Sequence, residues 1–274
     1  MLPSERRRDE EFAAREAAGE SVWTDQFDMR AKVRLSQLVA FFEDDLGRSL
    51  AEQTATLLRA WGGWNVGNFD SAVVKADISN DLLIDGLAAI AQAIKFMKSY
   101  DDTSAEFQRS ANVILREHRI SYKFVDDELI SFESDELLQE VVEPALQLMA
   151  GQRFSAAHKA YMDALKEISN GAPGDAITDA GTALQQTLVA LGCEGNALGP
   201  LLKDARRRGL LVGHDQNLID GISKFIDWAS ADRSTTGDAH KPSHAATSDA
   251  WLMVHVVGAL IVRLADAVPR GSAE

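Results

Sequence analysis

Apolar residues recur at intervals of three and four along most of the chain, which is the spacing of one face of an α-helix. Glycine falls between the periodic stretches, and proline is scarce. One face of the stretch from 29 to 45 carries Val33, Leu35, Leu38, Val39 and Phe42. The first half of the chain is therefore predicted to form helices over 29–45, 50–60, 80–100 and 104–117.

The helical spacing is interrupted between Ile120 and Phe132. Apolar and polar residues alternate from Ile120 to Phe124, and the alternation resumes at Ile130 after the polar turn 125–128. A period of two is typical of a strand that is buried on one face. The segment therefore predicts a β-hairpin, although no glycine occupies its turn.

Helical spacing returns after the hairpin. Ser134 can cap a helix whose first turn carries Asp135 and Glu136, which are favourable beside the positive end of the helix dipole. Glycine or proline separates the amphipathic stretches that follow. One helix is predicted to begin near 134, and others to cover 154–169, 173–192, 198–208, 216–231 and 247–268.

These amphipathic helices need one another's apolar faces, so we interpret the region after Ser134 as an antiparallel bundle. The predicted fold class is mostly α, with a helical N-terminal domain, a short β-hairpin and a C-terminal antiparallel helical bundle. The expected parts are a polar N-terminal tail (1–22), a helical N-terminal domain (23–118), a hairpin connector (119–133) and the bundle (134–268).

The composition is that of a globular protein, with 46% hydrophobic and 26% charged residues. Cys193 is the sole cysteine, which excludes an internal disulfide framework. The first 20 residues are highly charged, so we expect no signal peptide. The most apolar run, 250–265, contains His255 and Arg263 and is short for a bilayer span. These features predict a cytoplasmic protein without a membrane anchor.

The formal net charge of −14 is unevenly distributed along the chain. Before Gly195, 19 basic residues face 33 acidic ones, whereas from Gly195 to the end the numbers are nine and nine. Acidic surfaces repel polyanions, because lysine and arginine contacts to phosphates supply most non-specific affinity for nucleic acid. A general nucleic-acid coat protein is therefore not expected, but a local site in the last third is compatible with the charge.

The residues that could carry chemistry lie just before the last predicted helix. The chain has no phosphate-binding glycine loop, nucleophile elbow, His-Glu-x-x-His or paired-cysteine motif. The segment of interest reads Arg233-Ser-Thr-Thr-Gly-Asp-Ala-His240, and Lys241 and Pro242 follow it. Arg153 with His158 and Arg208 with His214 have similar spacing, but neither arginine is followed by a polar residue. The local context therefore selects Arg233 and His240.

This segment resembles the Arg-x(4–6)-His motif of the HEPN superfamily, in the form found in the C-terminal domain of abortive-infection proteins. The helix from Asp175 to Gln185 and the join between the hairpin and the next helix also resemble that family, so the likeness covers about 120–267. The first half resembles, more loosely, the helical N-terminal domains of the AbiJ type.

The resemblance implies a metal-independent endoribonuclease that needs no cofactor. It would act as a homodimer on RNA, as an abortive-infection or toxin-type effector in phage defence. His240 would be the general acid and base, because an ordinary histidine titrates near neutral pH. Arg233 would clamp the phosphate and stabilise its developing charge, and Ser234 would orient one of the two.

Other residues would assist this site. The candidates for binding RNA are Arg206, Arg207, Arg208, Lys224 and Lys241. The candidates for supporting the site are Asp179, Gln185 and Asp238, where Gln185 aligns with an acidic residue of the family and Asp179 would replace its charge. No metal ligand set is expected, because Pro242 lies between His240 and His244 and no further ligand pair follows.

A second interpretation needs no catalysis. Arg233 would cap the preceding helix and pair with Asp232 or Asp238, while His240 packs in the loop. The arginines at 206–208 would complement the dipole of the helix that they end. The chain would then be a HEPN-type dimerisation and interaction module, whose acidic N-terminal domain binds a regulatory or antitoxin protein.

Overall fold

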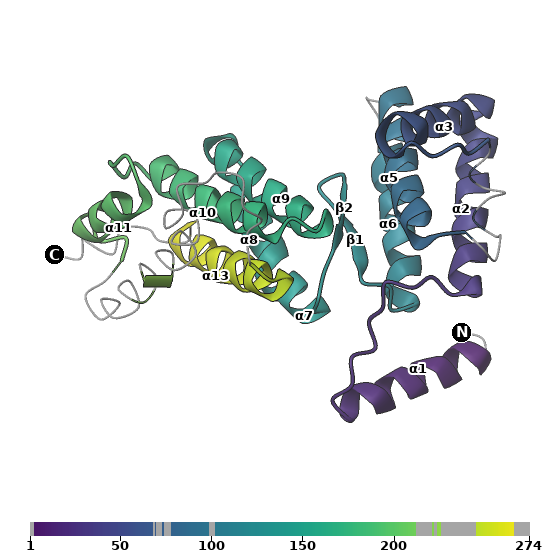
Figure 1. Cartoon of the computed structure of the whole chain (residues 1–274), viewed down its shortest axis with the longest axis horizontal. Helices are drawn as coiled ribbons and strands as arrows, with labels where there is room; N and C mark the ends of the chain where they lie inside the picture. Colours follow the sequence, from purple (N-terminus) through teal and green to yellow (C-terminus); the bar gives the residue numbers. More distant parts are fainter. Residues whose placement is uncertain are drawn as a thin grey trace. The chain divides into compact units, whose positions relative to one another are not determined.

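The computed structural model describes residues 3–67, 69, 73, 78–98, 102–211, 221, 224–225 and 245–265. The chain divides into two compact units, Met1–Glu133 (unit 1) and Ser134–Glu274 (unit 2). Both units are built mainly of α-helices, and the described residues contain one two-stranded antiparallel sheet (Figure 1). The predicted fold class, mostly α with a short hairpin, is confirmed.

The body of unit 1 is formed by the helices α2, α3, α5 and α6. α2 packs against α6, and α5 packs against both α3 and α6, as Figure 1 shows. Their apolar faces meet in one core, in which Leu35, Leu87 and Phe107 are fully buried. The bounds of the helices in unit 1 are α1 Pro3–Ala17, α2 Met29–Leu46, α3 Arg48–Gly62, α5 Asn80–Met97 and α6 Thr103–Glu117.

The starts of α2 and α5 are fixed by polar side chains. Asp28 precedes α2, and its Oδ1 accepts a hydrogen bond from the Ala31 amide at 2.8 Å. Ser79 precedes α5, and its hydroxyl accepts from the Leu82 amide at 3.2 Å. These side chains satisfy amides that have no partner within the helix. α2 ends at Gly47, whose φ of 78° is accessible to glycine at little cost.

The segment 1–22, expected to be a polar tail, contains the helix α1. α1 contacts the rest of unit 1 through Arg119, whose guanidinium lies 5.4 Å from the ring centre of Phe12. The same arginine lies 5.3 Å from the ring centre of Trp23 and 3.6 Å from a carboxylate oxygen of Glu16. One long side chain that follows α6 therefore holds a helix with little apolar surface of its own.

The predicted hairpin is present, with strand β1 at Tyr122–Val125 and strand β2 at Glu128–Ser131. The strands are antiparallel and pair Phe124 with Leu129. Asp126 and Asp127 form the turn with φ values of 46° and 69°, both in the left-handed region. Two-residue hairpin turns favour this conformation because it matches the strand twist, and aspartate tolerates it better than most residues.

Side chains of α5 and α6 hold this hairpin in place. Asp127 accepts from Lys95 Nζ at 2.6 Å and from Gln108 Nε2 at 2.7 Å. Burial raises the pKa of the Asp127 carboxyl, but these two donors outweigh it and hold the pKa below its ordinary value. Asn112 donates to the Phe124 carbonyl and accepts from the Phe124 amide, so it pairs with the strand as a neighbouring strand would.

Unit 2 starts with a helical segment that changes type along its length. Ser134 caps it by accepting from the Leu137 amide at 3.2 Å. Within the bundle, α10 packs against α9, α11 and α13, and α13 also packs against α8 and η1. The elements are α7 Asp135–Leu137, the π-helix η1 Leu138–Val142, α8 Glu143–Met149, the 3-10 turn η2 Gln152–Phe154, α9 Ser155–Ser169, α10 Pro173–Ala190, α11 Leu198–Arg207 and α13 Thr247–Ala265. The helix predicted over 216–231 lies mostly outside the described residues.

The last helix, α13, forms part of the core of unit 2. Its segment Thr247–Leu264 is long and apolar enough to cross a membrane, but half of that segment is buried within the protein. Tyr161 of α9 is fully buried, and its hydroxyl donates to the Val254 carbonyl of α13 at 2.9 Å. Burial and this contact indicate that α13 is a core helix of unit 2.

Candidate functional site

The residues of the predicted catalytic loop, Arg233, Ser234, Asp238, His240 and Lys241, lie outside the described residues. The description resumes at Ala245, shortly before α13. The start of α13 is fixed by Asp249, whose carboxylate accepts from the Ala246 amide at 2.9 Å. The helix that follows this segment in the sequence therefore has a defined, capped start.

The predicted RNA-binding arginines of α11 differ in their surroundings. Arg207 and Arg208 both form ion pairs with Asp204, which is 6% exposed. Asp204 also accepts from the Glu194 amide at 2.9 Å, and this bond together with the two arginines holds its pKa below the ordinary value. Through Asp204, Arg207 and Arg208 thus help to hold the loop before α11 in place. Arg206 is exposed, as is Lys224, and neither lies in an ion pair within the described part of the chain.

The two predicted supporting residues of α10 project from different sides of that helix. Asp179 and Gln185 are six positions apart, which corresponds to a rotation of about 240° around the helix axis. Partial burial raises the pKa of the Asp179 carboxyl, and the nearby acids Asp163, Glu167 and Asp175 raise it further. Asp179 therefore belongs to an acidic surface shared by α9 and α10, away from the side on which Gln185 lies.

The described residues contain a cavity in unit 1 that the sequence analysis did not identify. It has a volume of about 380 Å³. It is lined by Ser4 and Arg8 of α1, by Met29, Arg30, Val33 and Arg34 of α2, and by His118 directly after α6. Three arginines and one histidine thus contribute to the lining of a single cavity, although this half of the chain is strongly acidic.

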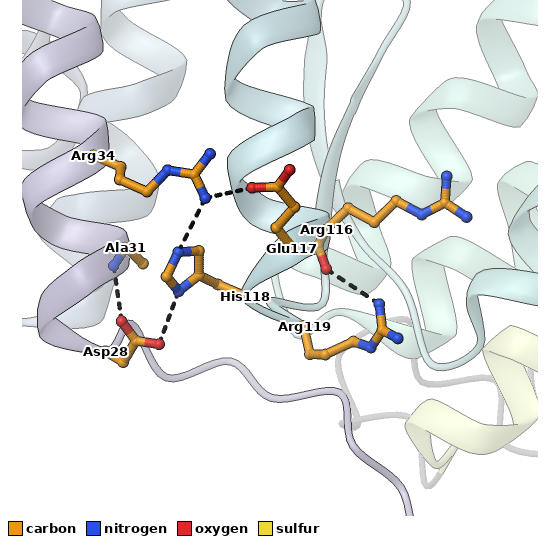
Figure 2. A network of polar contacts seen from close by, with 7 residues as sticks. All are labelled: Asp28, Ala31, Arg34, Arg116, Glu117, His118 and Arg119. Atoms are coloured by element: carbon orange, nitrogen blue, oxygen red, sulfur yellow. Dashed lines mark hydrogen bonds and ion pairs between the residues drawn. The ribbon is translucent and has the colours of Figure 1, made fainter. Parts of the chain in front are cut away.

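A chain of polar contacts joins residues that line this cavity, His118 and Arg34, to Asp28 and Glu117 (Figure 2). His118 has a side chain only 1% exposed, and its Nδ1 lies 2.8 Å from Oδ2 of Asp28. Its Nε2 lies 3.4 Å from Nη1 of Arg34, and Arg34 also forms an ion pair with Glu117. Because arginine only donates, Nε2 must accept, which places the proton of a neutral imidazole on Nδ1, facing Asp28.

Asp28 therefore has two roles at once. One carboxylate oxygen caps α2 through the Ala31 amide, and the other accepts from His118. Partial burial raises the pKa of this carboxyl, but the hydrogen bonds from His118 and Ala31 outweigh burial and lower the pKa below 3.8. The carboxylate stays ionised at neutral pH and holds the imidazole in a single orientation.

The charges around the cavity leave an excess of cations. Glu117 is paired with Arg34, and Asp28 is engaged by His118. Arg8 and Arg30 have no ion pair within the described part of the chain. The Nε of Arg8 is buried and has no hydrogen-bond partner among the described residues. A buried donor of this kind is unfavourable unless a ligand or water satisfies it.

Sequence reasoning missed the cavity because three segments far apart in the chain form it. The available signal was local: Asp28 precedes the first strong helical stripe and reads as a cap, and His118 closes the helix before the hairpin. The positions of Asp28 and His118 in the sequence do not indicate that either residue lies near Arg8.

Comparison with protein-family models, characterised proteins and solved structures finds no match to this chain. Within the described residues, no group of three histidine, cysteine, aspartate or glutamate side chains is placed to hold a metal ion.

Proposed function

We propose that this protein is a metal-independent endoribonuclease of the HEPN type, acting in the cytoplasm as an abortive-infection or toxin-type effector in phage defence. The observation that carries the proposal is the segment Arg233 to His240, which directly precedes the terminal core helix α13 of a mostly helical unit. The active species is a homodimer in which the two copies of this segment face one cleft.

The chemistry follows from the two residue types. The 2′-hydroxyl of RNA attacks the adjacent phosphorus, and the 5′-oxygen of the next nucleotide leaves. His240 removes the proton from the nucleophile or protonates the leaving oxygen, since imidazole exchanges protons near neutral pH. Arg233 binds the non-bridging oxygens through its planar guanidinium and stabilises the additional negative charge. DNA, which lacks the 2′-hydroxyl, is not cleaved by this route.

The described residues support a small RNA contact surface. Arg207 and Arg208 are engaged by Asp204, whereas Arg206 and Lys224 are exposed. We assign phosphate binding mainly to Arg206, Lys224 and Lys241. A few such contacts give weak affinity with a shallow dependence on salt, which suits a chain with a net charge of −14.

Cleavage of RNA in the presence of EDTA tests the proposal. The full chain should cut single-stranded RNA but not DNA of the same sequence, and Arg233→Ala and His240→Ala should each slow cleavage by at least about 100-fold. His158→Ala is the matched control, because His158 follows Arg153 with similar spacing but lies on α9. Equal activity in all variants, or RNA cleavage in none including the parent chain, would contradict the assignment.

The second candidate function, a non-catalytic interaction module, is favoured by the surface of unit 1. Phe41, Trp61 and Phe96 are 65%, 62% and 78% exposed, which is high for large aromatic side chains. Sedimentation of the chain, run beside the cleavage assay, separates the two candidates. A dimer without ribonuclease activity would support the module, and a dimer with activity that depends on Arg233 would support the nuclease.

A further inference from the structure

The cavity of unit 1 concentrates positive charge where the surrounding chain is acidic. Arg8, Arg30 and Arg34 line it together with His118, whereas the region before Gly195 has 19 basic and 33 acidic residues in total. Two carboxylates that contact lining residues, Asp28 and Glu117, are already engaged by His118 and Arg34. Local excess charge of this kind attracts an anion, and the acidic surroundings disfavour a long polyanion.

Arg34 is held in position before any ligand arrives. Glu117 and His118 both contact its Nη1 atom, as Figure 2 shows, so the orientation of the guanidinium plane is restricted. A guanidinium carries five N–H donors in a fixed fork, and these two contacts leave others for a ligand. A guanidinium with its orientation set in advance binds a phosphate with less loss of side-chain entropy.

Arg8 brings a further guanidinium to the cavity from α1. Its Nε is buried and lacks a hydrogen-bond partner among the described residues. Arg8 lies one turn beyond Ser4 on α1, and both residues line the cavity. The terminal nitrogens of the Arg8 guanidinium and the Ser4 hydroxyl can donate to phosphate oxygens in the cavity.

The cavity also has an apolar side. Met29 and Val33 line it from α2 and are 49% and 40% exposed. They lie four positions apart, so they share one face of the helix. A volume of about 380 Å³ is at the lower end of the range for small-molecule sites and accommodates a mononucleotide. The ligand therefore combines a phosphate with a flat or apolar portion.

We propose that this cavity binds a small phosphate ester of mononucleotide size, with the phosphate held by Arg8, Arg30 and Arg34 and the remainder packed on Met29 and Val33. The site lies in unit 1 and does not involve the predicted catalytic loop, so it stands independently of the proposed nuclease activity.

Calorimetric titration of the full chain at an ionic strength of about 0.15 M tests the proposal. The probes are the four ribonucleoside monophosphates, ribose 5-phosphate, inorganic phosphate and adenosine. At least one phosphate ester should bind saturably, and at least about tenfold more tightly than inorganic phosphate or adenosine. Absence of saturable binding by every ester up to about 10 mM would overturn the proposal, as would equal affinity for inorganic phosphate, which would assign the site to the free ion.

Variants locate the site within the chain. Arg8→Ala and Arg30→Ala should each weaken binding by about tenfold or more, whereas Arg7→Ala, on an exposed position of the same helix, should leave it unchanged. Circular dichroism of each variant shows that the helices are retained. Equal weakening by Arg7→Ala and Arg8→Ala would indicate general charge attraction and would contradict binding in the cavity. No RNA is present in this assay, so its result is separate from that of the cleavage test.

Discussion

His118 donates a hydrogen bond with one ring nitrogen and accepts with the other, and both partners are fixed. Asp28 receives the Nδ1 proton, and Arg34 donates to Nε2. The side chain is almost fully buried, so neither nitrogen can exchange its partner for bulk water. Because of this restriction, even a small change at Asp28 is expected to lower the stability of unit 1.

Asp28→Asn is predicted to destabilise unit 1 by about 1–3 kcal/mol at neutral pH. The asparagine oxygen can still cap α2, but its amide NH₂ then faces the Nδ1 proton of His118, so two donors oppose each other. Moving the histidine proton to Nε2 would create the same conflict with Arg34. Urea denaturation, with the midpoint compared at constant slope, measures this loss. Unchanged stability would show that His118 has another acceptor.

The same variant has a defined pH dependence. The pKa of Asp28 in the folded chain lies below its ordinary value of 3.8. Its stabilising contribution is therefore complete above that value and is lost as the pH falls through the folded pKa. The stability difference between the parent chain and Asp28→Asn should shrink between about pH 5 and pH 2, since a protonated aspartate resembles asparagine. A difference that stays constant over this range would contradict the assigned carboxylate role.

At the scale of elements, periodicity predicted the helices that bury a continuous apolar stripe. α2 and α6 begin within one residue of the predicted starts. The hairpin was also predictable, because apolar and polar residues alternate in both strands. How its turn forms without glycine was not predictable from the sequence. Asp126 and Asp127 adopt positive φ values, and Lys95 and Gln108 hold Asp127 from other helices. Such tertiary anchors leave no local pattern.

Two elements escaped prediction for physical reasons. α1 has no apolar stripe, and it contacts Arg119, which lies about a hundred positions further along the chain. The π-helix η1 depends on how Leu138–Val142 pack against α13, which the sequence spacing does not encode. The cavity of unit 1 also left no local pattern, because α1, α2 and His118, which line it, lie far apart in the chain.

The contact between α9 and α13 leads to a prediction about helix packing. A Cβ atom at Gly258 would lie 2.4 Å from the Tyr161 hydroxyl oxygen and 3.0 Å from a methyl carbon of Val141. Gly258→Ala should therefore destabilise unit 2 by about 1–3 kcal/mol. Tyr161→Phe, which removes the hydrogen bond to the Val254 carbonyl, should cost about 1 kcal/mol.

The double variant distinguishes a steric cause from a general weakening of α13. Removing the hydroxyl of Tyr161 also removes the closest clash with the new methyl group. Gly258→Ala combined with Tyr161→Phe should therefore lose less stability than the sum of the two single changes. Chemical denaturation of the parent chain, the two single variants and the double variant completes this double-mutant cycle. Strict additivity would show that the hydroxyl is not what requires glycine at this position.

At the scale of the molecule, charge and core follow different divisions of the chain. The excess of acids lies before Gly195, whereas the compact units meet at Glu133 and Ser134. Unit 2 therefore includes both an acidic surface around Asp179 and the balanced region that contains Arg233 and His240. Composition alone shows that acidic and basic residues are balanced in the last third, whereas the cavity lined by Arg8, Arg30 and Arg34 is found only from the structure of unit 1.

The two units are predicted to unfold as separate thermal transitions, because each contains its own buried core. Asp28→Asn should lower only the transition of unit 1, and Gly258→Ala only that of unit 2. For units of this size, a loss of 1 kcal/mol corresponds to a shift of about 3–5 °C. Scanning calorimetry of the full chain measures both transitions at once, and each variant serves as the control for the other. A single transition that both variants shift equally would instead show that the two cores unfold as one cooperative block, and ligand binding in unit 1 would then also stabilise unit 2.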